Sequence, residues 1–453
     1  MRKTEIVLLM LLFICSCSKQ MPDISFLSDS VDVGEVRNSI GLSDIKTYIS
    51  EYKGVPDTKM ADHMIQPVLF ETDTVLFLVN YEDGWELLSA DRRAPRVFAM
   101  SEKGHISIDS FSECPEIACL FDRFVSNVVF LKQHPEWDDS IVFQDVWSDY
   151  LPERSMDWQL VSSDVLWERD STQNHLTDTR WGQGSPWNIK APYRDSTRIQ
   201  HCYTGCVPVA ASQVLYYLHQ TLGIPDKAYQ ESSTMAFVPN GTSGLVLQPS
   251  DVQLDTASYS SSTWNTMPLV STSTNSFSGV STLMLQMGLY LEAHYYQNGT
   301  SAYTNYIKDV FETYYSILSN VSYNVDFDII ANQIFIENQP VILSIGRYDN
   351  NHSYHGHAVI VDACREHYQE IRRIYKREIP TMNPEQGPQY EFKLELTNEM
   401  ESRYVGINWG WNGAYMMSDG STIWFSTDAI SWEVAYVYTQ LNYMLYGFHV
   451  EES

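Results

Sequence analysis

The chain has 453 residues, of which 44% are hydrophobic and 13% aromatic, and this is enough apolar material for two or three packed domains. Its formal net charge of -28 at pH 7 argues against nucleic acid or an anionic membrane surface as the partner. Seven cysteines are too few for a disulfide scaffold in a chain of this length.

The N-terminal segment is predicted to be an export signal. Arg2 and Lys3 precede an apolar run of roughly ten residues, which is too short to span a bilayer. The sequence ICSC that follows ends at Cys17 and resembles the bacterial lipobox. The resemblance implies removal of residues 1–16, lipidation of Cys17 and a place in the bacterial cell envelope, as a surface-exposed or later released protein. An ordinary cleaved signal without lipid is the alternative. We expect the membrane to be reached only through the lipid anchor, because no later segment has the roughly 18 continuous apolar residues of a spanning helix.

A polar tether over residues 17–35 leads into a small mixed domain over residues 36–135. Its strand-like runs VLFLVN, WELLS and RVFAM are separated by turn sequences, which is typical of an antiparallel sheet. Helices are expected near residues 45–52 and 119–133. On the residues alone, this part of the chain shows no catalytic cluster.

The segment that follows is acidic and loosely patterned. We interpret residues 136–175 as a linker that contains the activation cleavage region, since exposed polar segments are preferred sites of proteolysis. The sequence leaves open whether Cys114 and Cys119, just before this segment, form a disulfide.

The run QHCYTGCVPVAASQVLYYLH places Cys206 directly after a glycine and before a helical pattern. Gly205 can adopt a backbone conformation that a residue with a Cβ resists, and Pro208 is tolerated in a first helical turn. Cys206 is therefore expected at the N-terminal end of a helix, where the peptide dipoles favour a thiolate over a thiol. A buried structural cysteine is the alternative, and so is a metal pair with Cys202, although no second pair completes a zinc site. The apolar positions expected on one face of this helix are Val207, Ala211, Val214 and Leu218.

Two candidate partners for a reactive cysteine lie on either side of it in the sequence. Gln183, in the loop RWGQGSPWN, can donate a side-chain N–H to an oxyanion beside the backbone N–H of Cys206, or it can be an ordinary solvated glutamine. The segment HGHAVIVDAC reads as a strand, and His357 begins its apolar part, so sheet geometry would position the ring. His355 is the second candidate for the base. A metal site formed by His352, His355 and His357 is the alternative, since histidines two apart on a strand can share a face.

The segment GINWGWNG near the C-terminus contains a candidate for orienting the histidine. An asparagine side-chain oxygen can fix an imidazole tautomer, and Asn408 has this role in the prediction. Trp409 would shield the pair from water through its large area. A glycine and tryptophan cluster that only builds core and tight turns is the alternative.

The motifs WGQGSPWN, TGCVPVAA, GHAVIVD and INWGW, in this order, resemble the streptopain family of papain-like bacterial cysteine peptidases. The stretch VNYEDGWELLSADRRAPRVFAMSEKG resembles the inhibitory propeptide of that family. The resemblance implies an α+β, papain-like fold over residues 176–453, with a helix-bearing lobe and a twisted antiparallel sheet lobe, preceded by a small α+β propeptide. The family more often carries glycine where Asn412 stands, and this departure concerns the shape of the loop that follows. The implied catalytic residues are Cys206, His357, Gln183, Asn408 and Trp409, and Ser301 and Ala302 are a weak carry-over to the substrate cleft.

The predicted function is that of a secreted or surface-anchored cysteine endopeptidase made as a zymogen. It would hydrolyse protein or peptide substrates through an acyl-enzyme, with its own propeptide as an intramolecular inhibitor and with no metal or organic cofactor. A papain-like acyltransferase or amidase would use the same residues without releasing new peptide termini from protein. A catalytically silent binding protein is the third reading, but it would have no need to keep all of these residues together.

Overall fold

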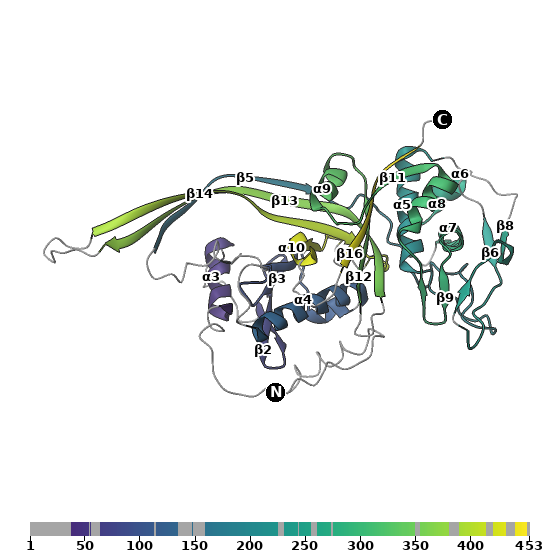
Figure 1. Cartoon of the computed structure of the whole chain (residues 1–453), viewed down its shortest axis with the longest axis horizontal. Coiled ribbons are helices and arrows are strands. Elements are labelled where there is room, and N and C mark those ends of the chain that lie inside the picture. Colours follow the sequence, from purple (N-terminus) through teal and green to yellow (C-terminus); the bar gives the residue numbers. More distant parts are fainter. Residues whose placement is uncertain are drawn as a thin grey trace. The chain divides into compact units, whose positions relative to one another are not determined.

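The computed structural model describes residues 38–53, 55, 64–112, 115–134, 147, 159–224, 231–242, 244–254, 261–272, 275–348, 354–379, 389–413, 420–431 and 440–450. Cys17, Cys114 and His352 therefore lie outside the described residues. The chain divides into two compact units, whose elements are labelled in Figure 1. Unit 1 comprises Met1–Thr172, Arg365–Val405 and Ile423–Val437, and unit 2 comprises Gln173–Cys364, Gly406–Thr422 and Tyr438–Ser453.

Unit 1 combines helices with an antiparallel sheet whose strand order is β1-β2-β3-β4-β15-β14-β13, with β5 paired to β13. Its strands are β1 (Ile65–Phe70), β2 (Asp73–Asn80), β3 (Trp85–Ser89), β4 (Val97–Ser101), β5 (Gln159–Gln173), β15 (Trp424–Ser426) and the parts of β13 (Tyr354–Ile379) and β14 (Gln389–Asn408) that belong to this unit. Its helices are α3 (Leu42–Tyr52), the 3-10 helix η2 (Ile108–Ser112), α4 (Pro115–Gln133) and α10 (Thr427–Ser431).

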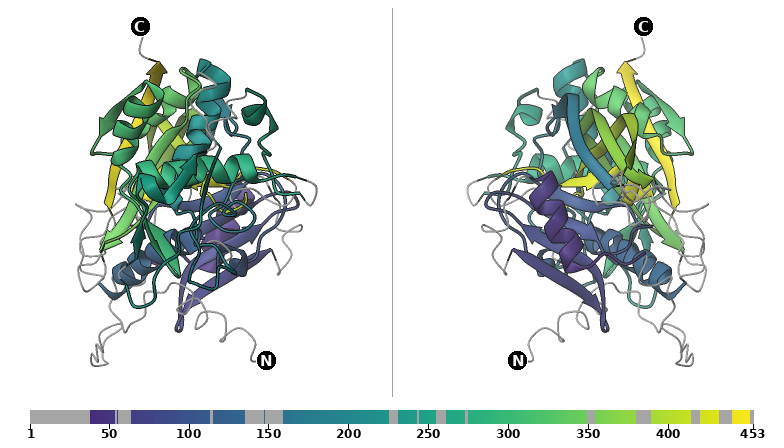
Figure 2. Two further views of the ribbon diagram at one scale, coloured as in Figure 1. Left: turned by 90° about the vertical axis from the view of Figure 1, so that its right-hand side faces the viewer. Right: turned by 90° about the vertical axis from the view of Figure 1, so that its left-hand side faces the viewer.

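The core of unit 1 forms where the helices cover the sheet, and Figure 2 shows α3 and α4 beside the strands. All five residues of β3 are buried. Phe98 of β4 packs against Phe124 of α4 with ring centroids 4.9 Å apart. The predicted strands and helices of this region are thus confirmed. Strand β1 is not predicted from the sequence; it carries Pro67 and lies at the edge of the sheet, where a residue without an N–H is tolerated.

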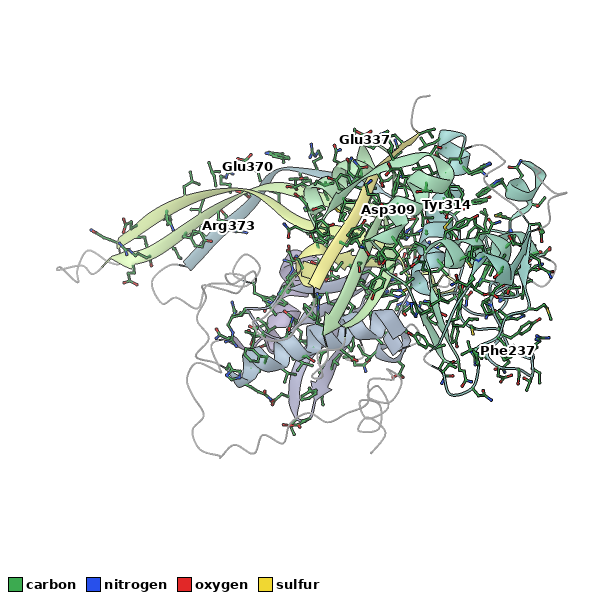
Figure 3. The ribbon with its side chains drawn as sticks, turned by 45° about the vertical axis from the view of Figure 1, so that its right-hand side comes forward. Phe237, Asp309, Tyr314, Glu337, Glu370 and Arg373 are labelled. Carbon is green, nitrogen blue, oxygen red and sulfur yellow. The ribbon has the colours of Figure 1, made fainter. Side chains whose placement is uncertain are left out.

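Residues 159–173 correct the sequence analysis, which placed them in an irregular linker. They form strand β5, which pairs with β13. The strand is held by polar contacts: Trp167 Nε1 donates to Glu370 at 2.6 Å, and Figure 3 labels Glu370 on β13. Trp167 itself is 49% exposed. A strand with exposed faces has no alternation of apolar and polar residues, and this is why its sequence reads as a loop. Apart from Trp147, Asn174 and His175, the rest of the predicted linker lies outside the described residues.

Unit 2 combines further helices with a second group of antiparallel strands, in the order β13-β12-β16-β11. Its helices are α5 (Cys206–Leu222), the 3-10 helix η4 (Pro249–Asp251), α6 (Ser261–Thr266), α7 (Ser278–Tyr290), α8 (Tyr306–Tyr315) and α9 (Phe327–Phe335). Its remaining strands are β6 (Ser232–Thr234), β7 (Leu245–Val246), β8 (Val252–Leu254), β9 (His294–Tyr296), β10 (Gly299–Ser301), β11 (Ile317–Ser322), β12 (Val341–Tyr348) and β16 (Gln440–Val450).

One hydrophobic cluster joins the helices of unit 2 to its sheet. It includes Val214 of α5, Leu283 of α7, Ile342 of β12 and Ile360 of β13, all of them fully buried. The predicted class, helices packed on an antiparallel sheet, is confirmed. Among the described residues, no helix combines the length and apolar composition needed to cross a membrane.

Candidate active site

Helix α5 begins at Cys206, as the sequence predicts. Gly205, before it, has φ 94° and ψ 149°, a conformation that is essentially open to glycine alone. A Cβ built on Gly205 would lie 3.0 Å from Cγ2 of Thr300, so the close approach of that side chain also favours glycine. Pro208 lies in the first turn, and the helix is buried around most of its circumference. The half-buried Cys206 side chain is therefore held at the N-terminal end of a rigid helix.

Gln183 is tied to the chain that leads into this helix. Its backbone carbonyl accepts hydrogen bonds from Thr204 N at 2.9 Å and from Thr204 Oγ1 at 3.2 Å. The residue is 8% exposed, and among the described residues its side-chain amide has no hydrogen-bond partner. Thr204 is two residues before Cys206, so these bonds hold Gln183 close to the start of the helix. A nearly buried amide with an unused N–H in this place has the properties of an oxyanion donor.

His357 lies on β13, opposite Ile345 of β12. Its Nε2 is 3.1 Å from the carbonyl oxygen of Trp409, and the two rings are nearly parallel with centroids 6.5 Å apart. A carbonyl oxygen only accepts hydrogen bonds, so Nε2 carries a hydrogen. In the neutral ring, Nδ1 then has the lone pair that can take a proton.

Contacts made by the residues next to His357 and Trp409 place this pair near α5. A Cβ built on Gly410, next to Trp409, would lie 3.1 Å from Cγ1 of Val209. Val209 is one helical turn after Cys206. In addition, Ala358, the neighbour of His357, belongs to the hydrophobic cluster against which Cys206 packs. The helix start and the histidine strand thus meet within unit 2.

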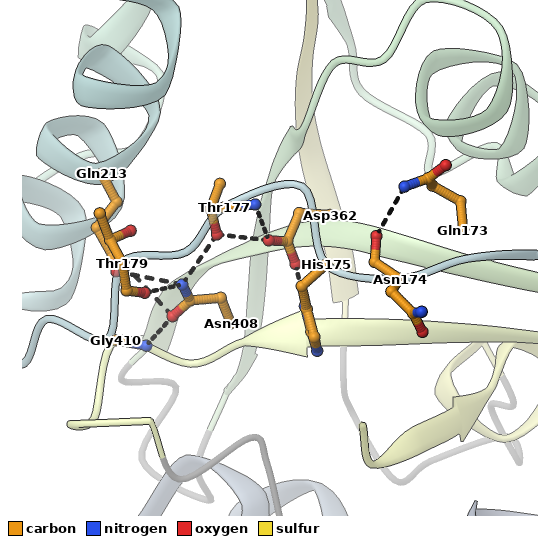
Figure 4. A network of polar contacts seen from close by, with 9 residues as sticks. All are labelled: Gln173, Asn174, His175, Thr177, Thr179, Gln213, Asp362, Asn408 and Gly410. Carbon is orange, nitrogen blue, oxygen red and sulfur yellow. Dashed lines mark hydrogen bonds and ion pairs between the residues drawn. The ribbon is translucent and has the colours of Figure 1, made fainter. Parts of the chain in front are cut away.

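Asn408 has partners other than the one expected. The sequence predicts that its side-chain oxygen accepts from the His357 ring. That oxygen instead accepts from Gly410 N at 3.1 Å and from Gln213 Nε2 at 3.4 Å (Figure 4). The bond to Gly410 closes a turn around Trp409. Asn408, which is 1% exposed, therefore fixes the backbone carbonyl that contacts His357 rather than the ring itself.

The remaining predicted residues lie on segments beside the site. Thr300 Oγ1 donates to the carbonyl of Tyr203 at 2.6 Å, which attaches the β9–β10 hairpin to the loop before Cys206. Ser301 at the end of this hairpin is exposed and Ala302 is half-buried. This location is compatible with a substrate cleft, and contact with substrate stays a prediction.

Asn412 takes φ 54°, the left-handed conformation that glycine favours and asparagine tolerates. Its side-chain oxygen accepts a hydrogen bond from Trp187 Nε1. The replacement of a more usual glycine is therefore accommodated at this position. Residues 414–419 after it lie outside the described residues.

Four polar residues of the site are not predicted from the sequence. Three of them contact Asn408, and the fourth, Asp362, contacts Thr177. A signal existed for two of them. Gln213 is a polar residue on the buried face of α5, and Asp362 ends the apolar run AVIV; both are fully buried. The complete set is Thr177, Thr179, Gln213 and Asp362.

The described residues offer little support for a metal site. They contain no group of three or more His, Cys, Asp or Glu side chains placed to hold an ion. Cys202 is fully buried, and this burial raises the pKa of its thiol to about 11 against the opposing effect of Arg194. The three-histidine alternative involves His352 and stays untested.

Comparison with known proteins identifies the family to which the chain belongs. A sequence model of the Peptidase C10 family matches residues 181–417, which is more than half of the chain. The chain is similar to a solved fragment of prointerpain A from Prevotella intermedia, with 19% identity and a TM-score of 0.49 over 86% of this chain and 100% of that one. It is also similar to the active interpain A cysteine protease of the same organism, with 20% identity and a TM-score of 0.37 over 61% of this chain and 96% of that one. A search of curated proteins found no match. On the extent of the family match, the chain belongs to the Peptidase C10 family and is a cysteine-type peptidase.

Proposed function

We propose that this peptidase is an endopeptidase in which Cys206 is the nucleophile, His357 the general base and acid, and Gln183 an oxyanion donor. The observation that carries the proposal is the position of Cys206 as the first residue of α5, after a glycine at φ 94°. A thiolate there faces the positive end of the helix dipole. The unused amide of Gln183 and the oriented ring of His357 complete the set that acyl transfer needs.

The reaction follows from these groups. The Cys206 thiol gives its proton to Nδ1 of His357, and the sulfur attacks the substrate carbonyl to form a C–S bond. The side-chain N–H of Gln183 and the backbone N–H of Cys206 stabilise the oxyanion. When the C–N bond breaks, His357 returns the proton to the leaving amine. His357 then takes a proton from water, whose oxygen attacks the thioester, and the acid product leaves with the thiol regenerated.

We also propose that the enzyme is made as a zymogen and exported as a lipoprotein. Two sequence features support this: the propeptide resemblance within residues 36–135 and the lipobox resemblance that ends at Cys17. Removal of the propeptide would expose the site after export. Cleavage in the polar chain before β5 would leave the whole of unit 2 connected.

The test is incubation of the purified chain, without residues 1–17, under reducing conditions. Intact mass is followed over time, and the product is labelled with a thiol-reactive peptide epoxide. Loss of roughly the first third of the chain, together with one adduct on Cys206, is expected. The proposal is contradicted if the chain does not process itself and Cys206 stays unlabelled even after an added protease has removed the N-terminal part.

Cys206→Ala is the matched control. Without the sulfur no acyl-enzyme can form, so we expect peptide turnover to fall by at least about a thousandfold while the fold is kept. Circular dichroism and thermal unfolding establish the fold, and release of new amino termini from a protein substrate measures turnover. Acyl transfer without new termini would indicate the acyltransferase or amidase alternative instead.

A further inference from the structure

Thr177 connects Asn408 to a buried carboxylate. Its backbone N–H and its hydroxyl lie 2.9 and 2.5 Å from Oδ2 of Asp362, and its Oγ1 lies 3.3 Å from Nδ2 of Asn408. The other carboxylate oxygen of Asp362 lies 2.6 Å from Nδ1 of His175 (Figure 4). Thr177 and Asp362 are 3% and 0% exposed, so these contacts are shielded from water.

The direction of each hydrogen bond is set by the carboxylate. The Thr177 hydroxyl has a single hydrogen, which it donates to Oδ2 of Asp362, so toward Asn408 it can only accept. Thr177 therefore selects the NH2 end of the Asn408 amide. The carbonyl of Thr179, 3.0 Å from the same nitrogen, selects the same end.

Gln213 completes the set from the side of α5. Its Oε1 accepts from Asn408 Nδ2 at 3.1 Å, and its Nε2 lies 3.4 Å from Asn408 Oδ1, which makes an amide-to-amide pair. If both amides flipped together, the pair would be kept, but the NH2 group of Asn408 would face the N–H of Gly410. The flip would also turn the Asn408 oxygen toward the Thr177 hydroxyl, which has no hydrogen left to donate, and Thr177 therefore disfavours it.

We propose that Thr177 is a positioning residue for the peptidase reaction. By holding Asn408 in the orientation whose oxygen accepts from Gly410, it fixes the Trp409 carbonyl and, through it, the tautomer and direction of the His357 ring. The proposal rests on the proposed function of His357. It concerns a hydroxyl that touches neither substrate nor the reacting atoms.

The experiment compares three single variants in a peptide-cleavage assay over a range of pH. Thr177→Val keeps the shape but removes the hydroxyl, and Thr177→Ser keeps the hydroxyl. Thr234→Val is the matched control: Thr234 is also buried, at 6% exposure, and its Oγ1 also donates to one group and accepts from another, but both lie around β6.

We expect Thr177→Val to lower kcat about fivefold to tenfold, the effect of one net hydrogen bond, with little change in KM. The alkaline limb of its kcat/KM profile should move to lower pH, because an imidazolium with a less fixed carbonyl acceptor loses its proton more readily. Thr177→Ser should behave like the wild type. Thr234→Val should lose stability but keep the wild-type kcat and pH profile.

The proposal is overturned if Thr177→Val matches Thr234→Val in kcat and pH profile, or if Thr177→Ser is as impaired as Thr177→Val. Should Thr177→Val fail to fold, Gln213→Met removes the other side of the amide orientation and must show the same shift of the alkaline limb; an unchanged limb overturns the proposal. The wild type and Cys206→Ala run in the same assay. If the wild type does not cleave, the proposed function itself fails, and this outcome is distinct from a silent Thr177 variant.

Discussion

Three cysteines of the described residues, Cys202, Cys206 and Cys364, have different surroundings. Cys202 and Cys364 are fully buried, whereas Cys206 is half-buried at the start of α5. Burial raises the pKa of Cys202 to about 11, so it stays a thiol at neutral pH. Since only the thiolate reacts with alkylating reagents, reactivity should be confined to Cys206 among these three.

We therefore predict that iodoacetamide at pH 7 modifies Cys206 in the native protein and leaves Cys202 unmodified. The rate difference should exceed about a hundredfold, from the low thiolate fraction of Cys202 and its lack of exposure. Peptide mass spectrometry after timed quenching measures both rates, and denatured protein is the control in which both sites must react. Comparable native rates at the two positions would show that the Cys202 thiol is accessible and reactive in the native protein.

At the residue scale, the sequence predicts which side chains matter better than it predicts their partners. Asn408 stands out because it is an amide in a glycine and tryptophan cluster. Its actual partners, Gln213 and Thr177, are about two hundred residues away in the sequence, and no local pattern joins them. His357 contacts the backbone carbonyl of Trp409, and a backbone carbonyl is a group that every residue has and that no sequence motif can mark.

At the scale of elements, the junction of Gly205 and α5 is where local sequence determines structure most fully. Gly205 combines a positive φ of 94° with the close approach of Thr300. At the other end of the helix, Gly223 has φ 66° but no atom within 4 Å of a built Cβ. The two glycines differ in what they position: one adjoins Cys206 and the other only ends the helix.

We predict that Gly205→Ala lowers the free energy of unfolding by about 1 to 3 kcal/mol and cuts turnover at least about tenfold, because the strained backbone shifts Cys206. Gly223→Ala is the matched control. It should cost about 1 kcal/mol, the penalty of a left-handed alanine, and leave turnover near the wild-type value. Denaturant unfolding and peptide cleavage give the two quantities. If both variants lose turnover equally, the helix start has no special role.

Elements with a buried face could be predicted, and elements without one could not. β3 and α5 carry apolar patterns because their side chains enter a core. β5 has no such pattern, since its contacts are with the polar and partly exposed side chains of β13, such as the ion pair of Asp164 with Arg372 at 2.8 Å. Its strand conformation depends on a partner that lies some two hundred residues later in the sequence.

At the scale of the whole chain, the units do not follow the sequence in two blocks. β13 and β14 each contribute residues to both units, and the predicted start of the peptidase domain at residue 176 falls inside the segment that carries His175 and Thr177. Unit 2 begins at Gln173. Sequence patterns predict domains as contiguous blocks of residues. They do not predict that the two strands of one long hairpin, β13 and β14, each contribute residues to both units.

A buried charged cluster around Glu86 ties the folding of unit 1 to pH. Glu86 on β3 is 3% exposed and lies 2.6 Å from Lys53 Nζ, and the hydroxyls of Tyr81 and Tyr48 donate to it at 2.8 and 3.2 Å. Burial by itself would raise the pKa of Glu86, but the attraction and hydrogen bond of Lys53 and the hydrogen bond from Tyr81 outweigh it. The pKa of Glu86 is therefore lower in the fold than its ordinary value of 4.5.

This shift predicts how unit 1 responds to acid. Because the folded pKa of Glu86 is depressed, its stabilisation is fully present above pH 4.5 and is lost as the pH falls through the lower folded value. The Glu86→Gln side chain cannot titrate, so unit 1 should be less stable at pH 7 by on the order of 2 kcal/mol and should lose less of its free energy of unfolding on acidification.

Glu102→Gln is the control, since Glu102 pairs with Arg365 while 59% exposed and a surface pair contributes little. Hydrogen exchange of the β3 amides between pH 3 and 7, corrected for intrinsic rates, measures the effect. Parallel pH dependence in the wild type and Glu86→Gln would show that another group sets the acid response of unit 1.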